Sequence, residues 1–138
     1  LFGCVSISKQ YSKLATSFLS QAFLSHYSVD DHISHNVKAR SPMASSRFQW
    51  NKKQIQHLSD IPIINKLVGR IDSGKSIPTL IRHYLSLNGR FVSFTINKGF
   101  NNALDGLIIV DLRDSPDHYL KRYMGADGLK AFKDKWSQ

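Results

Sequence analysis

The 138-residue chain contains no glutamate, only one cysteine and no long apolar run. The single cysteine, Cys4, excludes an internal disulfide framework and is compatible with a reducing compartment. No run approaches the roughly 18 apolar residues of a membrane helix, and the start does not resemble a signal peptide. We therefore expect a cytoplasmic protein, at most peripheral to the inner face of a membrane. Because the chain opens with Leu1 directly in a strand-like segment, we also expect one N-terminally truncated domain over residues 1–138.

Charge is concentrated in the middle of the chain, although the net charge of +9 belongs to the whole sequence. All ten acidic residues are aspartates, and between His32 and Leu104 only Asp60 and Asp72 oppose a long series of bases. The two flanking segments are each neutral. Such a basic region favours an acidic partner: an acidic carrier protein, anionic lipid headgroups or nucleic acid.

Periodicity predicts a mixed α+β domain. Residues 1–7 read as a strand, and apolar residues at helical spacing predict an amphipathic helix from Lys9 to Tyr27. The polar segment 28–49 predicts an exposed, flexible insertion. One or two short helices broken near Pro62 should follow over residues 50–68.

The segment from Ile77 to Leu112 predicts one supersecondary unit: helix, strand, asparagine-rich loop and strand. Ser76 is a suitable N-cap and Gly89 a suitable helix end. Phe91, Phe94 and Ile96 predict a half-buried strand, and the apolar run Leu107–Val110 predicts a strand covered on both faces, with the polar loop 98–106 between them. A helix interrupted at Gly125 should complete the chain.

Residues Gly69–Ser76 match the phosphate-loop pattern G-x-x-x-x-G-K-[ST] at every position. In that motif backbone amides cradle phosphates, and the lysine reaches the terminal ones. The motif requires a buried strand before the loop, whereas the spacing over residues 61–68 favours a helix. Pro78 also removes an amide where the phosphate-binding helix should begin. A nucleotide-binding protein that uses this loop remains an alternative function.

Three further patterns are weak. His26 and Asp31 have the H-x-x-x-x-D spacing of glycerolipid acyltransferases, but the glutamate-containing block of those enzymes is excluded by the composition. The histidines of the polar segment have no recognised metal-ligand spacing, so no metal site is predicted. Phe48 and Trp50 lie among basic residues, as in a base-stacking surface, and a basic nucleic-acid-binding module is a second alternative.

Four segments in order, LFGCVSIS, IPTLIRHYLSLNGRF, GFNNALDGLIIVDL and LKRYMG, resemble the C-terminal half of a family of enzymes. These are the GNAT-fold N-acyltransferases of the ornithine-lipid synthase and hemolysin-like group. The resemblance covers about residues 1–27 and 61–124. It implies that residues 1–7 are the fifth strand of that fold and that residues 90–97 and 106–112 are its final antiparallel pair. The sequence departs from the family pattern in one respect, because the strand that should precede residues 1–7, with its phosphate loop, is absent; Gly69–Ser76 comes after the fifth strand and cannot be that loop.

The resemblance implies direct attack of an amine, from an amino acid or lipid precursor, on a long-chain acyl thioester. The donor would be acyl carrier protein or CoA, with no tightly bound cofactor. Nucleic acid is not the partner expected under this interpretation.

The resemblance also implies site residues. One wall of the thioester slot would be formed by Gly3, Cys4, Val5 and Ser6. The phenol of Tyr11 is placed to protonate the leaving thiolate, with a core role as the alternative. The acceptor would be held by Arg82, Asn101, Asn102 and Asp105. For the residues of the polar loop, turn formation is an equal alternative.

Overall fold

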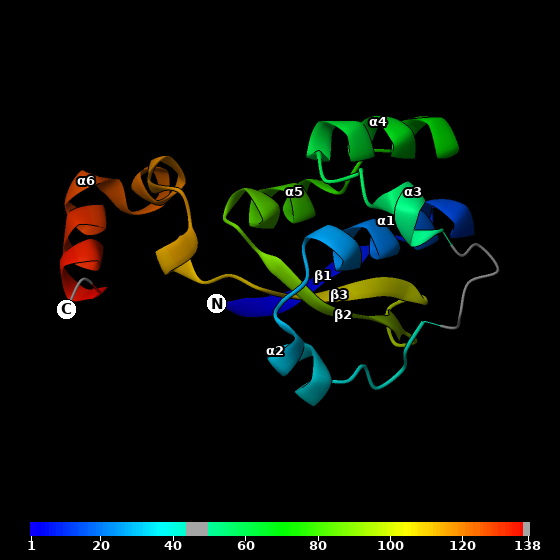
Figure 1. Ribbon diagram of the computed structural model, residues 1–138, viewed down its shortest axis with the longest axis horizontal. Coiled ribbons are helices and arrows are strands. Elements are labelled where there is room, and N and C mark those ends of the chain that lie inside the picture. The colour runs from blue at the N-terminus through cyan, green and yellow to red at the C-terminus, as the bar shows by residue number, and fades with distance from the viewer. Residues whose placement is uncertain (44–49, 137–138) are drawn as a thin grey trace.

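The chain forms a three-stranded antiparallel sheet with helices packed mainly on one face, which confirms the mixed α+β class (Figure 1). The computed structural model describes residues 1–43 and 50–136. The strands are β1 (Phe2–Ile7), β2 (Arg90–Asn97) and β3 (Ala103–Ile109). The helices are α1 (Lys13–His26), α2 (Asp31–Asn36), α3 (Lys52–Ile55), α4 (Ile61–Ile71), α5 (Thr79–Ser86), the 3-10 helix η1 (Leu112–Asp114) and α6 (Asp117–Trp136).

The last strand lies in the middle of the sheet, in the order β1-β3-β2. Both neighbours run antiparallel to β3, so β1 and β2 are parallel to each other and are joined through the helical segment. Gly106 marks the centre of the register, with Val5 opposite it on β1 and Phe94 opposite it on β2.

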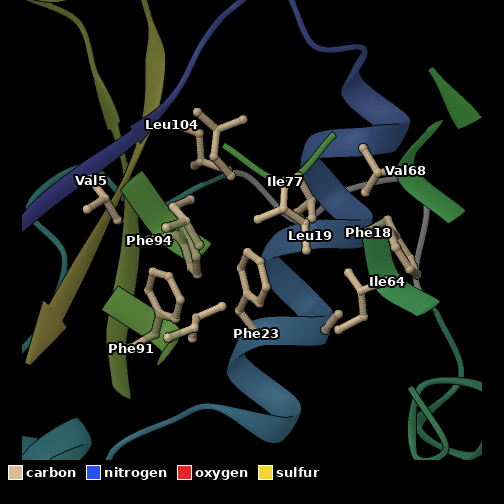
Figure 2. Packing of buried hydrophobic residues seen from close by; sticks show 14 of the residues in the cluster. Val5, Phe18, Leu19, Phe23, Ile64, Val68, Ile77, Phe91, Phe94 and Leu104 are labelled. Atoms are coloured by element: carbon tan, nitrogen blue, oxygen red, sulfur yellow. The ribbon is translucent and has the colours of Figure 1, made fainter. Parts of the chain in front are cut away.

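The hydrophobic core fills the space between one face of the sheet and helices α1, α4 and α5 (Figure 2). Phe91 and Phe94 of β2 stack with ring centroids 4.9 Å apart, and Phe23 of α1 stacks on Phe91 at 5.1 Å. Gly106 lies beneath this stack, where a side chain would collide with both rings of β2. The absence of a side chain on the middle strand therefore lets the aromatic rings approach the sheet.

Helix α1 begins four residues later than expected. The Ser12 hydroxyl accepts a hydrogen bond from the Ala15 amide at 3.1 Å, so Ser12 is the N-cap and Lys13 the first helical residue. Tyr11 therefore precedes the helix, in a turn whose Tyr11 amide donates to the Ser8 carbonyl.

The predicted limits of two other elements also change. Helix α5 begins at Thr79 with Pro78 at the N-cap position, so Ser76 is not its cap. Strand β3 begins at Ala103 and ends at Ile109, three residues earlier at each end than the sequence suggested. Of the one or two short helices expected near Pro62, the structure has two, α3 and α4, with Pro62 in the first turn of α4.

The polar segment after α1 is attached to the outer edge of β2. Ser28 forms a parallel bridge with Phe91, and Pro42 an antiparallel bridge with Thr95. Helix α2 lies between them, on the opposite side of the sheet from α1 in Figure 1. Residues 44–49, including Phe48 of the proposed stacking surface, lie outside the described residues.

The interruption predicted at Gly125 is confirmed. This residue has φ 75° inside α6, a left-handed conformation that favours glycine, and it divides the helix into two parts. Helix α6 lies beyond the end of β3 in Figure 1. A salt bridge between Lys133 and Asp117 joins its two parts.

Candidate functional site

The two edges of the sheet differ in their backbone partners. Along β2, the Phe91 amide donates to the Tyr27 carbonyl at 2.6 Å and the Ile96 amide to the Ser41 carbonyl at 2.9 Å. Along the outer edge of β1, residues 1–43 and 50–136 supply no paired strand. Among the described residues, the open edge is therefore that of β1, the strand for which the resemblance implies a thioester slot.

The backbone groups that face this open edge follow from one reciprocal pair. Leu1 and Val110 exchange two hydrogen bonds, each of 2.8 Å. In an antiparallel ladder such pairs alternate with pairs whose amide and carbonyl groups point outward. Phe2, Cys4 and Ser6 therefore direct their N–H and C=O groups away from β3, toward the open edge.

The four predicted wall residues divide between the two faces of β1. The Val5 side chain is buried in the core, and Gly3 lies on the same face. The Cys4 and Ser6 side chains are exposed on the other face, here called the outer face of the sheet. Of the predicted set, Cys4 and Ser6 combine outward backbone groups with accessible side chains.

Asp105 lies within β3 and not in the preceding loop, which corrects the prediction. It occupies the outer face, and only 6% of it is exposed. The Ser6 hydroxyl donates to Oδ1 of Asp105 at 2.6 Å, and the Asn97 side-chain amide donates to Oδ2 at 2.7 Å. Two residues predicted for separate roles, Ser6 and Asp105, are thus in direct contact.

Asn97 was not predicted. Alternation along β2 puts Asn97 on the same face as Thr95, a signal that the sequence contains, but only the register of β2 with β3, in which Thr95 pairs with Asp105, puts that face beside the carboxylate.

Asn101 and Asn102 form the turn between β2 and β3. Their φ values are 51° and 54°, and the Ala103 amide donates to the Phe100 carbonyl at 2.9 Å. Two successive left-handed residues closed in this way define a type I′ turn, which favours asparagine. Both residues are exposed at the tip of the hairpin. Turn formation therefore accounts for these asparagines.

Tyr11 lies on the helical side of the sheet, apart from Asp105. Its phenol donates to the Ser76 carbonyl at 2.6 Å, and Lys75 lies over its ring at 5.3 Å. Burial raises the pKa of Tyr11, and the nearby Asp72 carboxylate raises it further. The ring packs against the hydrophobic core, as the alternative interpretation expected.

The phosphate-loop sequence occupies the end of α4 and the turn that follows. Gly69 is helical, and the Lys75 amide donates to the Asp72 carbonyl at 2.9 Å. A helix, not a strand, therefore precedes the loop. Arg82, on the exposed face of α5, donates to the Thr79 hydroxyl at 3.3 Å and lies on the Tyr11 side of the molecule.

An open cleft of about 690 Å³ lies at the other end of the outer face. It is lined by Ser28, Val29, Asp30, Ile33, Asn88, Arg90, Ile109, Asp111 and Asp114. The Arg113 guanidinium forms a bidentate pair with Asp111 and lowers the pKa of that carboxyl to about 2. Within the described ranges, no three His, Cys or Asp side chains are grouped closely enough to hold a metal ion.

Comparison with known proteins does not assign a family. No family model, curated protein or solved structure matches the chain. Across residues 1–43 and 50–136, no helix has the length and apolar character needed to cross a membrane.

Proposed function

We propose that the protein is an N-acyltransferase. It would move a long-chain acyl group from a thioester to a primary amine by direct attack of the amine on the thioester carbon. The observation that carries this proposal is the open edge of β1, where Cys4 and Ser6 present backbone groups that no described strand pairs, beside the buried carboxylate of Asp105. The phosphopantetheine arm of CoA or acyl carrier protein contains amide groups. These would pair with the strand edge as an added strand does.

The acceptor amine would lie on the outer face, near Asp105. A carboxylate stabilises a nearby ammonium group. Asp105 also lies next to the open edge, because its Oδ1 accepts a hydrogen bond of 2.6 Å from Ser6 of the edge strand. The proposed reaction needs no tightly bound cofactor. Tyr11 is less suited to protonating the thiolate, since its phenol donates a hydrogen bond to the Ser76 carbonyl on the other side of the sheet.

The partner proposed for the basic region is acyl carrier protein, which is strongly acidic. Exposed bases lie on several elements of the helical layer: Lys53 on α3, Lys66 and Arg70 on α4, and Arg82 on α5. Complementary charge would raise the rate of encounter and make binding sensitive to salt. In a cytoplasmic protein, the same bases would support peripheral contact with the anionic inner face of a membrane.

The edge is tested by removing one outward N–H. In Cys4→Pro the ladder to β3 is retained, because proline is tolerated where the lost amide faces outward from an edge strand. We expect the affinity for a non-transferable acyl-CoA thioether, measured by calorimetry, to fall by at least roughly threefold. Cys4→Ala, which keeps the amide, should bind as the natural chain does. Equal binding by Cys4→Pro and Cys4→Ala would refute the edge as the thioester site.

The partner is tested separately with acyl carrier protein at 50 and 300 mM salt. We expect binding to weaken with salt and in the charge reversals Lys53→Glu and Arg70→Glu. Binding that is absent or independent of salt contradicts the carrier assignment. Parallel titrations with magnesium-ATP and with random DNA test the two alternative functions.

A further inference from the structure

Asp105 is a buried carboxylate that has no cationic partner among the described residues. It sits in the middle strand with 6% of its surface exposed. Within residues 1–43 and 50–136, the salt bridges are Arg113–Asp111 and Lys133–Asp117, so no lysine, arginine or histidine neutralises Asp105. Its hydrogen bonds come from two neutral groups, the Ser6 hydroxyl and the Asn97 amide.

Such an arrangement suits a site that receives a cation from outside. Burying a carboxylate is costly unless it is hydrogen-bonded and paired, and here the hydrogen bonds are present while the described part of the chain supplies no pairing charge. The exposed residue Ser6 lies between solvent and the carboxylate. An ammonium group that approaches along the open edge would therefore meet the Ser6 hydroxyl first.

Ser6 also connects the two halves of the proposed reaction. Its backbone groups face the open edge of β1, whereas its hydroxyl donates to Asp105 at 2.6 Å. A thioester paired with this edge and an amine bonded to the hydroxyl would both contact the same residue. Binding in this way would bring the reacting nitrogen and carbonyl carbon next to each other.

We propose that Ser6 and Asp105 form a proton relay that converts the acceptor from ammonium to amine, an inference that rests on the proposed acyltransferase function. The Ser6 oxygen takes a proton from the ammonium as the Ser6 hydroxyl proton passes to Oδ1 of Asp105. The neutral nitrogen then forms a bond to the thioester carbon. When the tetrahedral intermediate collapses, the C–S bond breaks, the nitrogen loses its second proton and the thiolate gains one. Asp105 releases the first proton to solvent, which restores the relay.

Asn97 has a positioning role in this relay. By donating to Oδ2 at 2.7 Å it holds the carboxylate so that Oδ1 stays directed at Ser6. The hydrogen bond also satisfies the oxygen that does not take part in proton transfer.

The test compares acceptors that differ in protonation. With a short peptide as the α-amine acceptor and an acyl-CoA donor, Asp105→Asn should lower kcat at pH 7 by about 100-fold or more, the usual contribution of a positioned base. Its kcat should then rise about tenfold between pH 7 and pH 9, because the free fraction of an α-amine of pKa near 8 rises by that factor. Ser6→Ala should shift the pH profile in the same direction.

Methoxyamine, which is uncharged at pH 7, removes the need for the relay. With this acceptor, the natural chain and Asp105→Asn should react at similar rates. Ser93→Ala, on the same face, and Asp111→Asn, at the distant cleft, are matched controls that should leave the pH profile unchanged. Thermal unfolding of each variant shows whether the fold is retained.

The outcomes separate the two proposals. If the natural chain neither binds the acyl-CoA thioether nor turns over, the acyltransferase function fails. If it turns over while Asp105→Asn and Ser6→Ala keep its pH profile, or if methoxyamine does not restore the rate of Asp105→Asn, the relay is refuted and acyl transfer stands.

Discussion

Gly106 controls how closely the aromatic stack approaches the sheet, and adding one methyl group there should measurably destabilise the protein. A Cβ at this position would lie 2.7 Å from Cε1 of Phe91 and 2.7 Å from Cε1 of Phe94. Favourable carbon–carbon contacts lie at about 3.5–4.0 Å, so each ring would have to move by about 1 Å. Phe91 is fully buried and Phe94 nearly so, and their stack continues to Phe23.

The magnitude follows from two opposing effects. Overpacking a well-packed core costs typically 1–3 kcal/mol, and the collision with two buried rings places Gly106→Ala near the upper end. Replacing glycine by alanine in a strand returns about 0.5–1 kcal/mol of backbone entropy. We therefore expect a net loss of about 2 kcal/mol in the free energy of unfolding, or about 6–8 °C in Tm for a domain of this size.

Gly3 supplies the matched control. It lies on the same face of the neighbouring strand, opposite Ile108, but a Cβ there meets no atom within 4 Å. Gly3→Ala should therefore be neutral or more stable by up to about 0.5–1 kcal/mol. Urea unfolding followed by circular dichroism, with an unchanged m-value, measures both variants. Equal stability of Gly106→Ala and Gly3→Ala would refute the steric argument. In a Phe94→Leu background, which shortens one ring, the cost of Gly106→Ala should decrease.

Two other changes test the hairpin and the cleft. Asn101→Ala should lower the free energy of unfolding by about 1–2 kcal/mol, because the residue has φ 51°. Asn102→Gly should be neutral or stabilising. Equal urea midpoints for the two variants would contradict the type I′ assignment. In Arg113→Ala the pKa of Asp111 should rise from about 2 toward its ordinary value, as measured by NMR titration. Because the pKa of Asp111 is lower in the folded protein, its pairing with Arg113 stabilises the fold fully at pH values above the ordinary carboxyl pKa. This stabilisation is lost as the pH falls through about 2. Both side chains are exposed, so its effect on stability should be small; an Asp111 midpoint that stays near 2 without Arg113 would contradict the pairing.

The elements were largely predictable because their signals are local. The spacing of apolar residues identified α1, and Pro62 and Gly125, which interrupt helices, located two helix boundaries. Errors of a few residues arose where a single hydrogen bond sets the limit, as the Ser12 cap does for α1. The same kind of local contact, the type I′ turn, moved the start of β3 to Ala103.

The candidate site was only partly predictable. Ser6 was selected by its place in the first strand and Asp105 as part of the loop between the last two strands, so they were given separate roles, and Asn97 was not selected. Their contact depends on the order of the strands, which brings together residues that are 99 positions apart in the sequence. An alternating pattern shows which residues share a face, but it cannot show which strand lies next to which.

The sequence alone determined the class of the fold, the sites of its strands and the concentration of positive charge in its middle, since these depend on composition and on neighbours along the chain. The tertiary structure decided that β3 lies in the centre, that β2 is covered by residues 27–29 and 41–42, and that the outer edge of β1 has no partner among the described residues. It also decided that Asp105 is buried between Ser6 and Asn97. The physical reason is that backbone pairing and burial are relations between segments distant in sequence, and they exist only once the sheet is assembled.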